Sequence, residues 1–215
     1  MPTIAYKLKD GTQVSGTTTI ISQNLGWNKQ ALMYWANQVG QDGKSHRDVS
    51  KEAADAGTCC HYLIDCHIKR IEPDLSTFTP DNINKAETGF LNFLEWEKMV
   101  DLRTVATEVN LVSEKYRYGA TPDLIGTVVD KLALIDWKTS NGVYSDYLLQ
   151  LAAYRVAWEE VHPEQPLEGG FHLLRISKED AAFHHHHWGS LPEAWDAFEC
   201  LLKLHKLQKI LSKKV

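Results

Sequence analysis

An apolar segment of this chain ends in an acid and a base that lie two residues apart. Residues 132–135 are Leu-Ala-Leu-Ile, and Asp136, Trp137 and Lys138 follow them. Because side chains alternate across a β-strand, we expect Asp136 and Lys138 on one face of a strand and Trp137 on the other. A carboxylate and an ammonium fixed side by side at the end of a strand suggest a metal ligand and a group that stabilises negative charge.

Five further polar residues are expected to gather around this pair. They are His61, Glu108, Asp123, Gln150 and Tyr154. Carboxylate oxygens are the ligands that Mg²⁺ and Mn²⁺ prefer, and an imidazole among them favours Mn²⁺. Such ions can activate a water for attack on a phosphate, and a second ion can stabilise the leaving oxygen. The residues therefore predict metal-assisted hydrolysis of phosphodiesters, in which Lys138 stabilises charge on the phosphate or positions the attacking water.

The motifs that contain these residues resemble those of the PD-(D/E)XK nuclease superfamily. Pro122-Asp123 matches its Pro-Asp motif, and Asp136-Trp137-Lys138 matches its (Asp/Glu)-X-Lys motif. Residues 57–61, Gly-Thr-Cys-Cys-His, are similar to the Gly-Thr-X-X-His motif of the RecB-like and Cas4-like branch, and residues 150–154 are similar to its Gln-X-X-X-Tyr motif. The resemblance begins near residue 17, where the chain is similar to the start of phage and mitochondrial genome-maintenance exonucleases, and extends to about residue 158.

This resemblance implies a role for each residue. The metal ligands would be His61, Glu108, Asp123, Asp136 and the backbone carbonyl of Trp137. The catalytic residues would be Glu108, Asp123, Asp136 and the lysine Lys138, whereas Gln150 and Tyr154 would orient that lysine or contact the DNA end. The resemblance implies Mg²⁺ or Mn²⁺ in a two-metal site. It implies no iron–sulfur cluster, because relatives that bind one use three C-terminal cysteines and this chain has only Cys200 there.

The expected fold is a single α/β domain over residues 1–215, with a PD-(D/E)XK core in which a mixed central sheet is flanked by helices. Residues 1–101 would be mainly helical and arch over the active site. Residues 102–188 would form the catalytic sheet and its helix, and residues 189–215 a C-terminal helix. A cytoplasmic protein is expected, because the chain lacks an apolar run that could span a membrane and lacks a signal peptide.

The hydrophobic periodicity predicts the individual elements. Helices are expected at 28–39, 47–71, 81–100, 146–161 and 192–213, and strands at 104–112, 116–129, 131–137, 170–176 and 182–188. The first three of these strands would form an antiparallel meander. A hairpin is expected around Asp10-Gly11, between residues 4 and 14. Gly57, inside a predicted helix, suggests that another part of the backbone approaches closely there.

Cysteine and histidine clusters have simpler interpretations. Cys59, Cys60, Cys66 and Cys200 fit neither a disulfide framework nor a zinc pattern, and we expect them to be small buried residues. The histidines at 184–187 are expected to be half-exposed residues of a strand, where alternation would let at most two of them share a metal ion. The lysines near the C-terminus are expected on a solvated helix face, with contacts to phosphates as the alternative.

The functional hypothesis is a metal-dependent DNA exonuclease that acts on ends and threads single-stranded DNA past His61 and Tyr154, in phage or bacterial replication, recombination or repair. Two alternatives remain: a structure-specific endonuclease of the same fold, and a catalytically silent nucleic-acid-binding protein. The net charge of −5 neither favours nor excludes DNA as a partner. The complete set of carboxylates with Lys138 argues against the catalytically silent alternative. No membrane partner is expected. The sequence leaves protein partners open.

Overall fold

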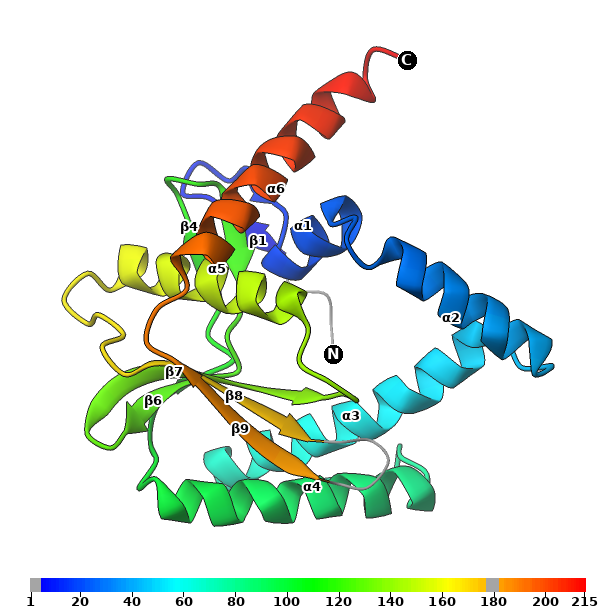
Figure 1. Cartoon of the computed structure of the whole chain (residues 1–215). Helices are drawn as coiled ribbons and strands as arrows, with labels where there is room; N and C mark the ends of the chain where they lie inside the picture. Colours follow the sequence, from blue (N-terminus) through cyan, green and yellow to red (C-terminus); the bar gives the residue numbers. More distant parts are fainter. Residues whose placement is uncertain (1–4, 177–181) are drawn as a thin grey trace.

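The computed structural model describes residues 5–176 and 182–215, and a five-stranded mixed sheet lies at its centre (Figure 1). In the order in which they pair, the strands are β3 (Arg103–Thr107), β6 (Leu124–Val128), β7 (Lys131–Thr139), β8 (Gly170–Ile176) and β9 (Phe183–Trp188). All neighbours are antiparallel except β7 and β8, which are parallel. Helix α5 (Ser145–Val161) connects these two, as a parallel pair requires.

Helices cover both faces of the sheet because its central strands are apolar on both sides. Helices α1 (Thr17–Asn24), α5 and α6 (Pro192–Leu211) pack on the face that carries Leu134. Helices α3 (His46–Lys69) and α4 (Pro80–Met99) pack on the face that carries Ile135. The predicted α/β class, with a mixed sheet flanked by helices, is confirmed, and the predicted helices are found within a few residues of their expected bounds.

The predicted meander needs a correction between residues 104 and 129. The segment expected as one strand at 104–112 is broken at Glu108, where φ is 44°, and resumes as β4 (Leu111–Ser113). The segment expected at 116–129 is divided at residues 121–123 into β5 (Tyr118–Ala120) and β6. Strands β4 and β5 form a separate antiparallel pair, so only β3, β6 and β7 make the meander. The left-handed backbone at Glu108 interrupts the first segment. Pro122, which has no N–H to donate, interrupts the second.

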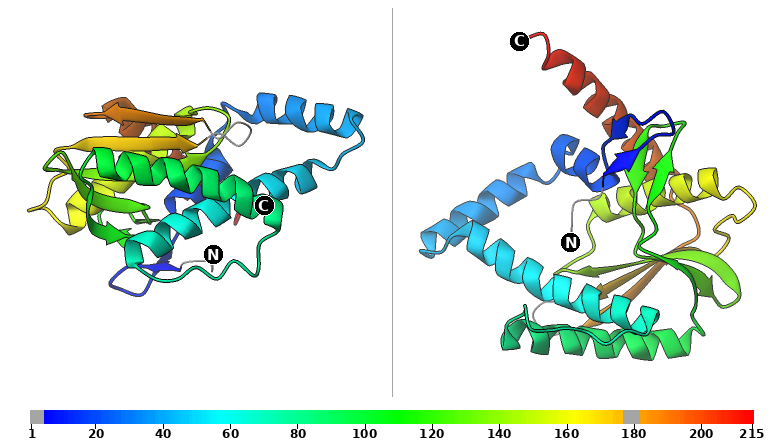
Figure 2. Two further views of the ribbon diagram at one scale, coloured as in Figure 1. Left: turned by 90° about the horizontal axis from the view of Figure 1, so that it is seen from below. Right: turned by 180° about the vertical axis from the view of Figure 1, so that it is seen from behind.

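An arm of helices joins the two layers on the side where β7 ends. Figure 1 shows α1, α2 (Lys29–Gln41) and the start of α3 running from the α5 and α6 layer to the α3 and α4 layer. Helix α2 buries none of its residues, and Figure 2 shows it standing away from the sheet. The side chains of Trp27 and Tyr34 are more than 60% exposed, at 63% and 68%. No helix in the described part of the chain is long and apolar enough to cross a bilayer.

The N-terminal hairpin is confirmed for its described residues. Strands β1 (Tyr6–Lys7) and β2 (Gln13–Val14) pair antiparallel, and Gly11 in the turn has a φ of 84° that favours glycine. Residue 4, where the prediction began, lies outside the described residues.

Three of the four cysteines are buried as predicted, but Cys200 is exposed. It lies on α6, whose inward face is formed by residues such as Phe198 and Leu202, so that Cys200 points outward. The expectation that all four are buried is therefore wrong for this residue.

The histidine run lies on a strand, as predicted, and its members alternate between faces; this strand, β9, is at the edge of the sheet. His185 and His187 share a face with His172 of β8, and His185 Nε2 lies 2.8 Å from His172 Nδ1. The ring of Trp96 on α4 contacts both His172 and His185. Burial lowers the pKa of His172 to about 4 and also lowers the pKa of His185, so both rings are neutral at pH 7, with His172 buried and His185 exposed.

Helix α3 passes directly over the end of β7 because Gly57 has no side chain. A Cβ at Gly57 would lie 2.3 Å from Oγ1 of Thr139, the last residue of β7. Another element approaches closely here, but the prediction that its backbone does so is wrong, because the nearest atoms belong to the Thr139 side chain. This contact places the helix that carries His61 beside the strand that carries Lys138.

We predict that Gly57→Ala and Gly40→Ala change stability in opposite directions. Alanine favours both helices by about 1 kcal/mol over glycine. At Gly40 nothing lies within 4 Å of the new Cβ, so the free energy of unfolding should rise. At Gly57 the new Cβ would lie 2.3 Å from Thr139 Oγ1, so overpacking should cost about 2 to 3 kcal/mol, which exceeds the helix gain and lowers the free energy of unfolding. Chemical denaturation measures both variants, and equal changes would contradict the close approach.

Candidate active site

The acid and base of β7 form a buried ion pair on one face of the strand, as alternation predicts. Lys138 Nζ lies 2.6 Å from Asp136 Oδ2, and the two side chains are 18% and 1% exposed. Trp137 points to the opposite face, where its ring contacts Phe93. Neither oxygen of Asp136 accepts a well-directed hydrogen bond in the described part of the chain, so the contact with Lys138 is an ion pair.

Asp123 connects three strands at this end of the sheet. Its Oδ2 accepts a hydrogen bond from the backbone N–H of Trp137 at 3.1 Å, and its carbonyl accepts one from the N–H of Glu108 at 3.1 Å. The Asp123 carboxylate is therefore held against β7, beside Asp136.

The two carboxylates are unusually costly to ionise in this position. Burial raises the pKa of Asp136 to about 6; the Lys138 ammonium opposes this shift, and the Asp123 carboxylate adds to it. Burial also raises the pKa of Asp123, against the effect of Lys138. For Lys138, burial acts to lower the pKa, but the carboxylates of Asp136 and Asp123 outweigh it and raise the pKa overall. The lysine is therefore charged at neutral pH.

His61 reaches the site from α3, as predicted. Its half-buried ring lies 5.8 Å from the ring of Trp137, centroid to centroid. Burial, and to a smaller extent the Lys138 ammonium, lower its pKa to about 4, against the effects of Asp136 and of a hydrogen bond with the Trp137 backbone. His61 is thus neutral at pH 7, which is the form of imidazole that binds metals.

Glu108 has a different setting from the one predicted. It does not lie mid-strand but at the break after β3, and its side chain is 35% exposed. Its Oε2 lies 3.4 Å from Lys69 Nζ, and Lys69 also pairs with Asp65 of α3 at 2.7 Å. The Glu108 carboxylate adds to the raised pKa of Asp123, which places it near the other carboxylates.

Helix α5 supplies the predicted polar face. Gln150 Nε2 donates to the hydroxyl of Tyr154 at 2.5 Å, and Tyr154 is 4% exposed. Burial raises the pKa of Tyr154 strongly, and the Asp136 carboxylate contributes, so its hydroxyl faces the site as a neutral donor. Tyr147, one turn before Gln150, places its ring centroid 5.5 Å from Lys138 Nζ.

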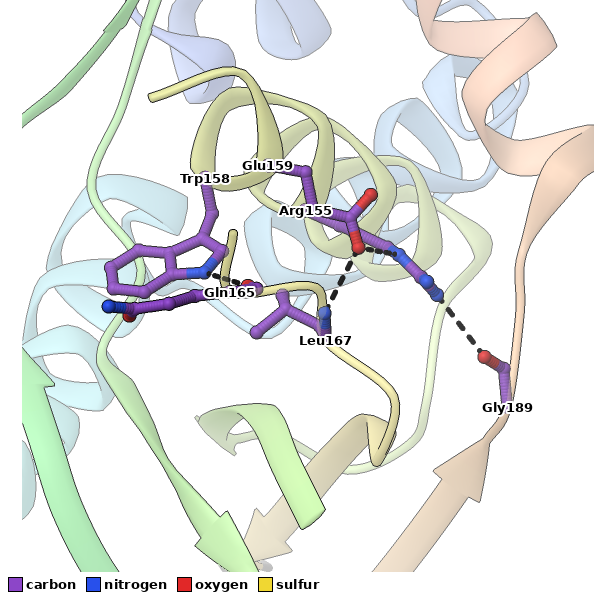
Figure 3. A network of polar contacts seen from close by, with 6 residues as sticks. All are labelled: Arg155, Trp158, Glu159, Gln165, Leu167 and Gly189. Atoms are coloured by element: carbon purple, nitrogen blue, oxygen red, sulfur yellow. Dashed lines mark hydrogen bonds and ion pairs between the residues drawn. The ribbon is translucent and has the colours of Figure 1, made fainter. Parts of the chain in front are cut away.

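Hydrogen bonds at its far end fix the orientation of α5 (Figure 3). Glu159 Oε1 accepts from Arg155 Nε at 2.8 Å and from the backbone N–H of Leu167 at 3.1 Å. Arg155 also donates to the carbonyl of Gly189 at 3.2 Å. The helix is thereby tied to the segments before β8 and after β9.

Sequence reasoning missed four residues of this region. They are Tyr6, Asp65, Lys69 and Tyr147. A signal existed for two of them, because Asp65 and Lys69 continue the four-residue spacing of Gly57 and His61 along α3. Nothing local marks Tyr6: it lies on the N-terminal hairpin, its hydroxyl bonds to Thr121 Oγ1 at 2.8 Å, and its ring packs on Gly119.

The site has the donor chemistry of a divalent-cation site, but its side chains are not yet arranged as one. In residues 5–176 and 182–215, no three His, Cys, Asp or Glu side chains are placed to hold a metal ion together. Lys138 contacts Asp136 and Lys69 contacts Glu108, so each ammonium occupies one side of a carboxylate. The buried oxygens of Asp136 without hydrogen bonds, with the neighbouring Asp123 and a neutral imidazole, fit Mg²⁺ or Mn²⁺.

Comparison with known proteins identifies the fold. No protein-family model and no curated protein matches the chain. Among solved structures, the chain is similar to the crystal structure of a "putative exonuclease" from Eubacterium rectale, with a TM-score of 0.55 and 15% identity. The match covers 76% of this chain and 69% of that chain. At this identity the similarity shows a shared fold, and membership of the RecB-like branch stays a prediction.

We predict that Asp136→Asn stabilises the protein in a pH-dependent way, measured in EDTA. When the pKa of a carboxyl is higher in the folded chain than in the unfolded chain, the free energy of unfolding falls as the pH rises from about 4 to about 6. Asparagine cannot ionise and escapes that loss. The variant should therefore exceed wild type by about 1 to 3 kcal/mol at pH 7 and by little at pH 4. A stability difference that does not vary with pH would contradict the burial of an ionising carboxyl at this position.

Proposed function

We propose that this protein is a metal-dependent nuclease that hydrolyses phosphodiester bonds at DNA ends. The observation that carries the proposal is the buried Asp136–Lys138 pair beside Asp123, because a fold has no structural need for charges that are so costly to bury. The similarity to the Eubacterium rectale structure agrees with it, since that protein is described as a "putative exonuclease".

The ligands of Mg²⁺ or Mn²⁺ would be His61, Glu108, Asp123, Asp136 and the carbonyl of Trp137. Such ions, when bound, lower the pKa of a water and offset charge on the phosphate and the leaving oxygen. Two ions are expected, because an ion such as Mg²⁺ keeps several of its waters and binds only one or two carboxylates, whereas three carboxylates are proposed here.

The residues of the chain itself perform three tasks in this proposal. Lys138 donates a hydrogen bond to a phosphate oxygen or to the attacking water, and Asp136 and the Tyr147 ring hold its ammonium in position. Gln150 and Tyr154 present neutral donors on the face of α5 that turns toward Asp136, where they orient the lysine or bind the DNA end. The burial of Asp136 keeps bulk water away, which strengthens each of these contacts.

Single-stranded DNA is the substrate that the helical arm favours. Trp27 and Tyr34 are exposed on the arm between α1 and α3, and Trp35 is partly exposed at 39%. Aromatic side chains stack on unpaired bases without regard to sequence, whereas a duplex hides the faces of its bases. A strand that passes beside this arm toward Lys138 would be degraded from its end, as replication, recombination and repair require.

The proposal is tested with end-labelled linear DNA, single- and double-stranded, and with closed single-stranded circles, in Mn²⁺ or EDTA. We expect degradation of linear single strands in Mn²⁺ and none of circles. Lys138→Ala should lower the rate about 100-fold or more, the usual loss when a group that stabilises the transition state is removed. Lys131→Ala, an exposed lysine at the other end of β7, should not change it.

Each result has a distinct meaning. Cleavage of circles would replace the exonuclease with a structure-specific endonuclease of the same site. Failure to cleave any substrate, with Lys138→Ala indistinguishable from wild type, would refute the enzyme and favour a catalytically silent binding protein.

A further inference from the structure

One face of α3 carries a second lysine toward the site. Gly57, His61, Asp65 and Lys69 follow one another at intervals of four residues, so they lie along one face of the helix. Gly57 packs on the end of β7 and His61 contacts Trp137, which fixes this face toward the site. Lys69 therefore stands two turns after His61, which belongs to the proposed metal centre.

Lys69 lies between carboxylates of two different elements. Its Nζ is 2.7 Å from Asp65 on its own helix and 3.4 Å from Glu108, which follows β3. The Asp65 side chain is only 16% exposed and holds Lys69 through both of its oxygens, with Nζ 2.7 Å from Oδ1 and 2.8 Å from Oδ2. The pKa of Lys69 is raised, chiefly by its hydrogen bond to Asp65 and against some desolvation, so its charge is stable.

The Glu108 side chain can move while its backbone stays in place. The backbone N–H of Glu108 is bound to Asp123, whereas its carboxylate is 35% exposed and touches Lys69 by the longer of the two contacts. A rotation about its side-chain bonds would turn the carboxylate from Lys69 toward Asp123 and Asp136. The shorter contact with Asp65 would keep Lys69 beside the site after that rotation.

We propose that Lys69 is a counter-ion that gives up Glu108 to a divalent cation and then binds a phosphate oxygen of the DNA strand. The inference rests on the proposed nuclease function and adds a phosphate-binding residue to it. An ammonium and a metal ion that use the same carboxylate compete for it, so Lys69 weakens metal binding before the substrate arrives. Once the metal takes Glu108, the lysine retains a free side and faces a negatively charged substrate.

The charges near the site are consistent with this exchange. Asp65, Glu108, Asp123 and Asp136 carry four negative charges when ionised, and Lys69 and Lys138 carry two positive charges. Among these six residues two negative charges remain, which one divalent cation neutralises. A second cation would leave the site positive, and the phosphates of a DNA strand would restore the balance.

The test compares Lys69→Met with wild type in two binding assays, because methionine keeps an apolar stem and removes the charge. Calorimetry with Mn²⁺, without DNA, should show binding about two- to fivefold tighter in the variant, the range set by a partly exposed ion pair. Fluorescence anisotropy with a labelled single-stranded oligonucleotide, with Ca²⁺ in place of Mn²⁺, should show binding weaker by a similar factor. Lys85→Met is the matched control, since Lys85 forms an i,i+4 pair with Asp81 on α4, with 2.6 Å between the charged atoms.

Opposite changes in the two assays, with Lys85→Met like wild type, would support the exchange. An unchanged or weaker Mn²⁺ affinity, or an unchanged DNA affinity, would overturn it, provided that circular dichroism shows the variant folded. If wild type cleaves DNA and binds Mn²⁺ while Lys69→Met behaves identically, this inference alone fails. If wild type binds neither Mn²⁺ nor DNA, the proposed nuclease function fails, and the role of Lys69 fails with it.

Discussion

The contact between Asp136 and Lys138 at the end of β7 buries two charges, and the surrounding structure must stabilise them. Two charges at 2.6 Å, one of them almost fully buried, are expensive to remove from water, and their mutual attraction offsets only part of that cost. The raised pKa of Asp136 shows that the attraction of Lys138 does not fully offset the cost of burying this carboxylate. Two neighbouring buried carboxylates, only partly offset by one ammonium, form an environment that favours a divalent cation.

Three elements far apart in the chain hold that pair in place. Helix α3 can lie over the end of β7 only because residue 57 is glycine, and it thereby brings His61 and Lys69 to the site. The other side is covered by α5, which Glu159 and Arg155 tie to the loops around β8 and β9. Asp123 joins β6 to β7 by a side-chain hydrogen bond. Apart from Glu108, the proposed catalytic groups thus lie on or directly beside regular elements, and the proposed exchange requires movement only of the Glu108 side chain.

Local patterns predicted the parts of the site that depend on one element. Strand alternation placed Asp136 and Lys138 on one face, and helical spacing placed Gln150 beside Tyr154. The strand assignment of Glu108 failed because a left-handed backbone at a non-glycine residue leaves no trace in hydrophobic periodicity. Tyr6 could not be predicted either: its contact with Thr121 crosses more than a hundred residues and depends on the way the hairpin packs.

As a metal-dependent nuclease, this protein should hold a divalent cation with Asp123 and Asp136, beside Lys138. The most direct measurement is an anomalous difference map from crystals of the protein soaked in Mn²⁺ with a short single-stranded oligonucleotide. We expect a peak about 2.1 Å from carboxylate oxygens of both aspartates, the distance typical of small hard cations, with Glu108 turned toward it. Clear density for the oligonucleotide without a manganese peak at these residues would contradict the account.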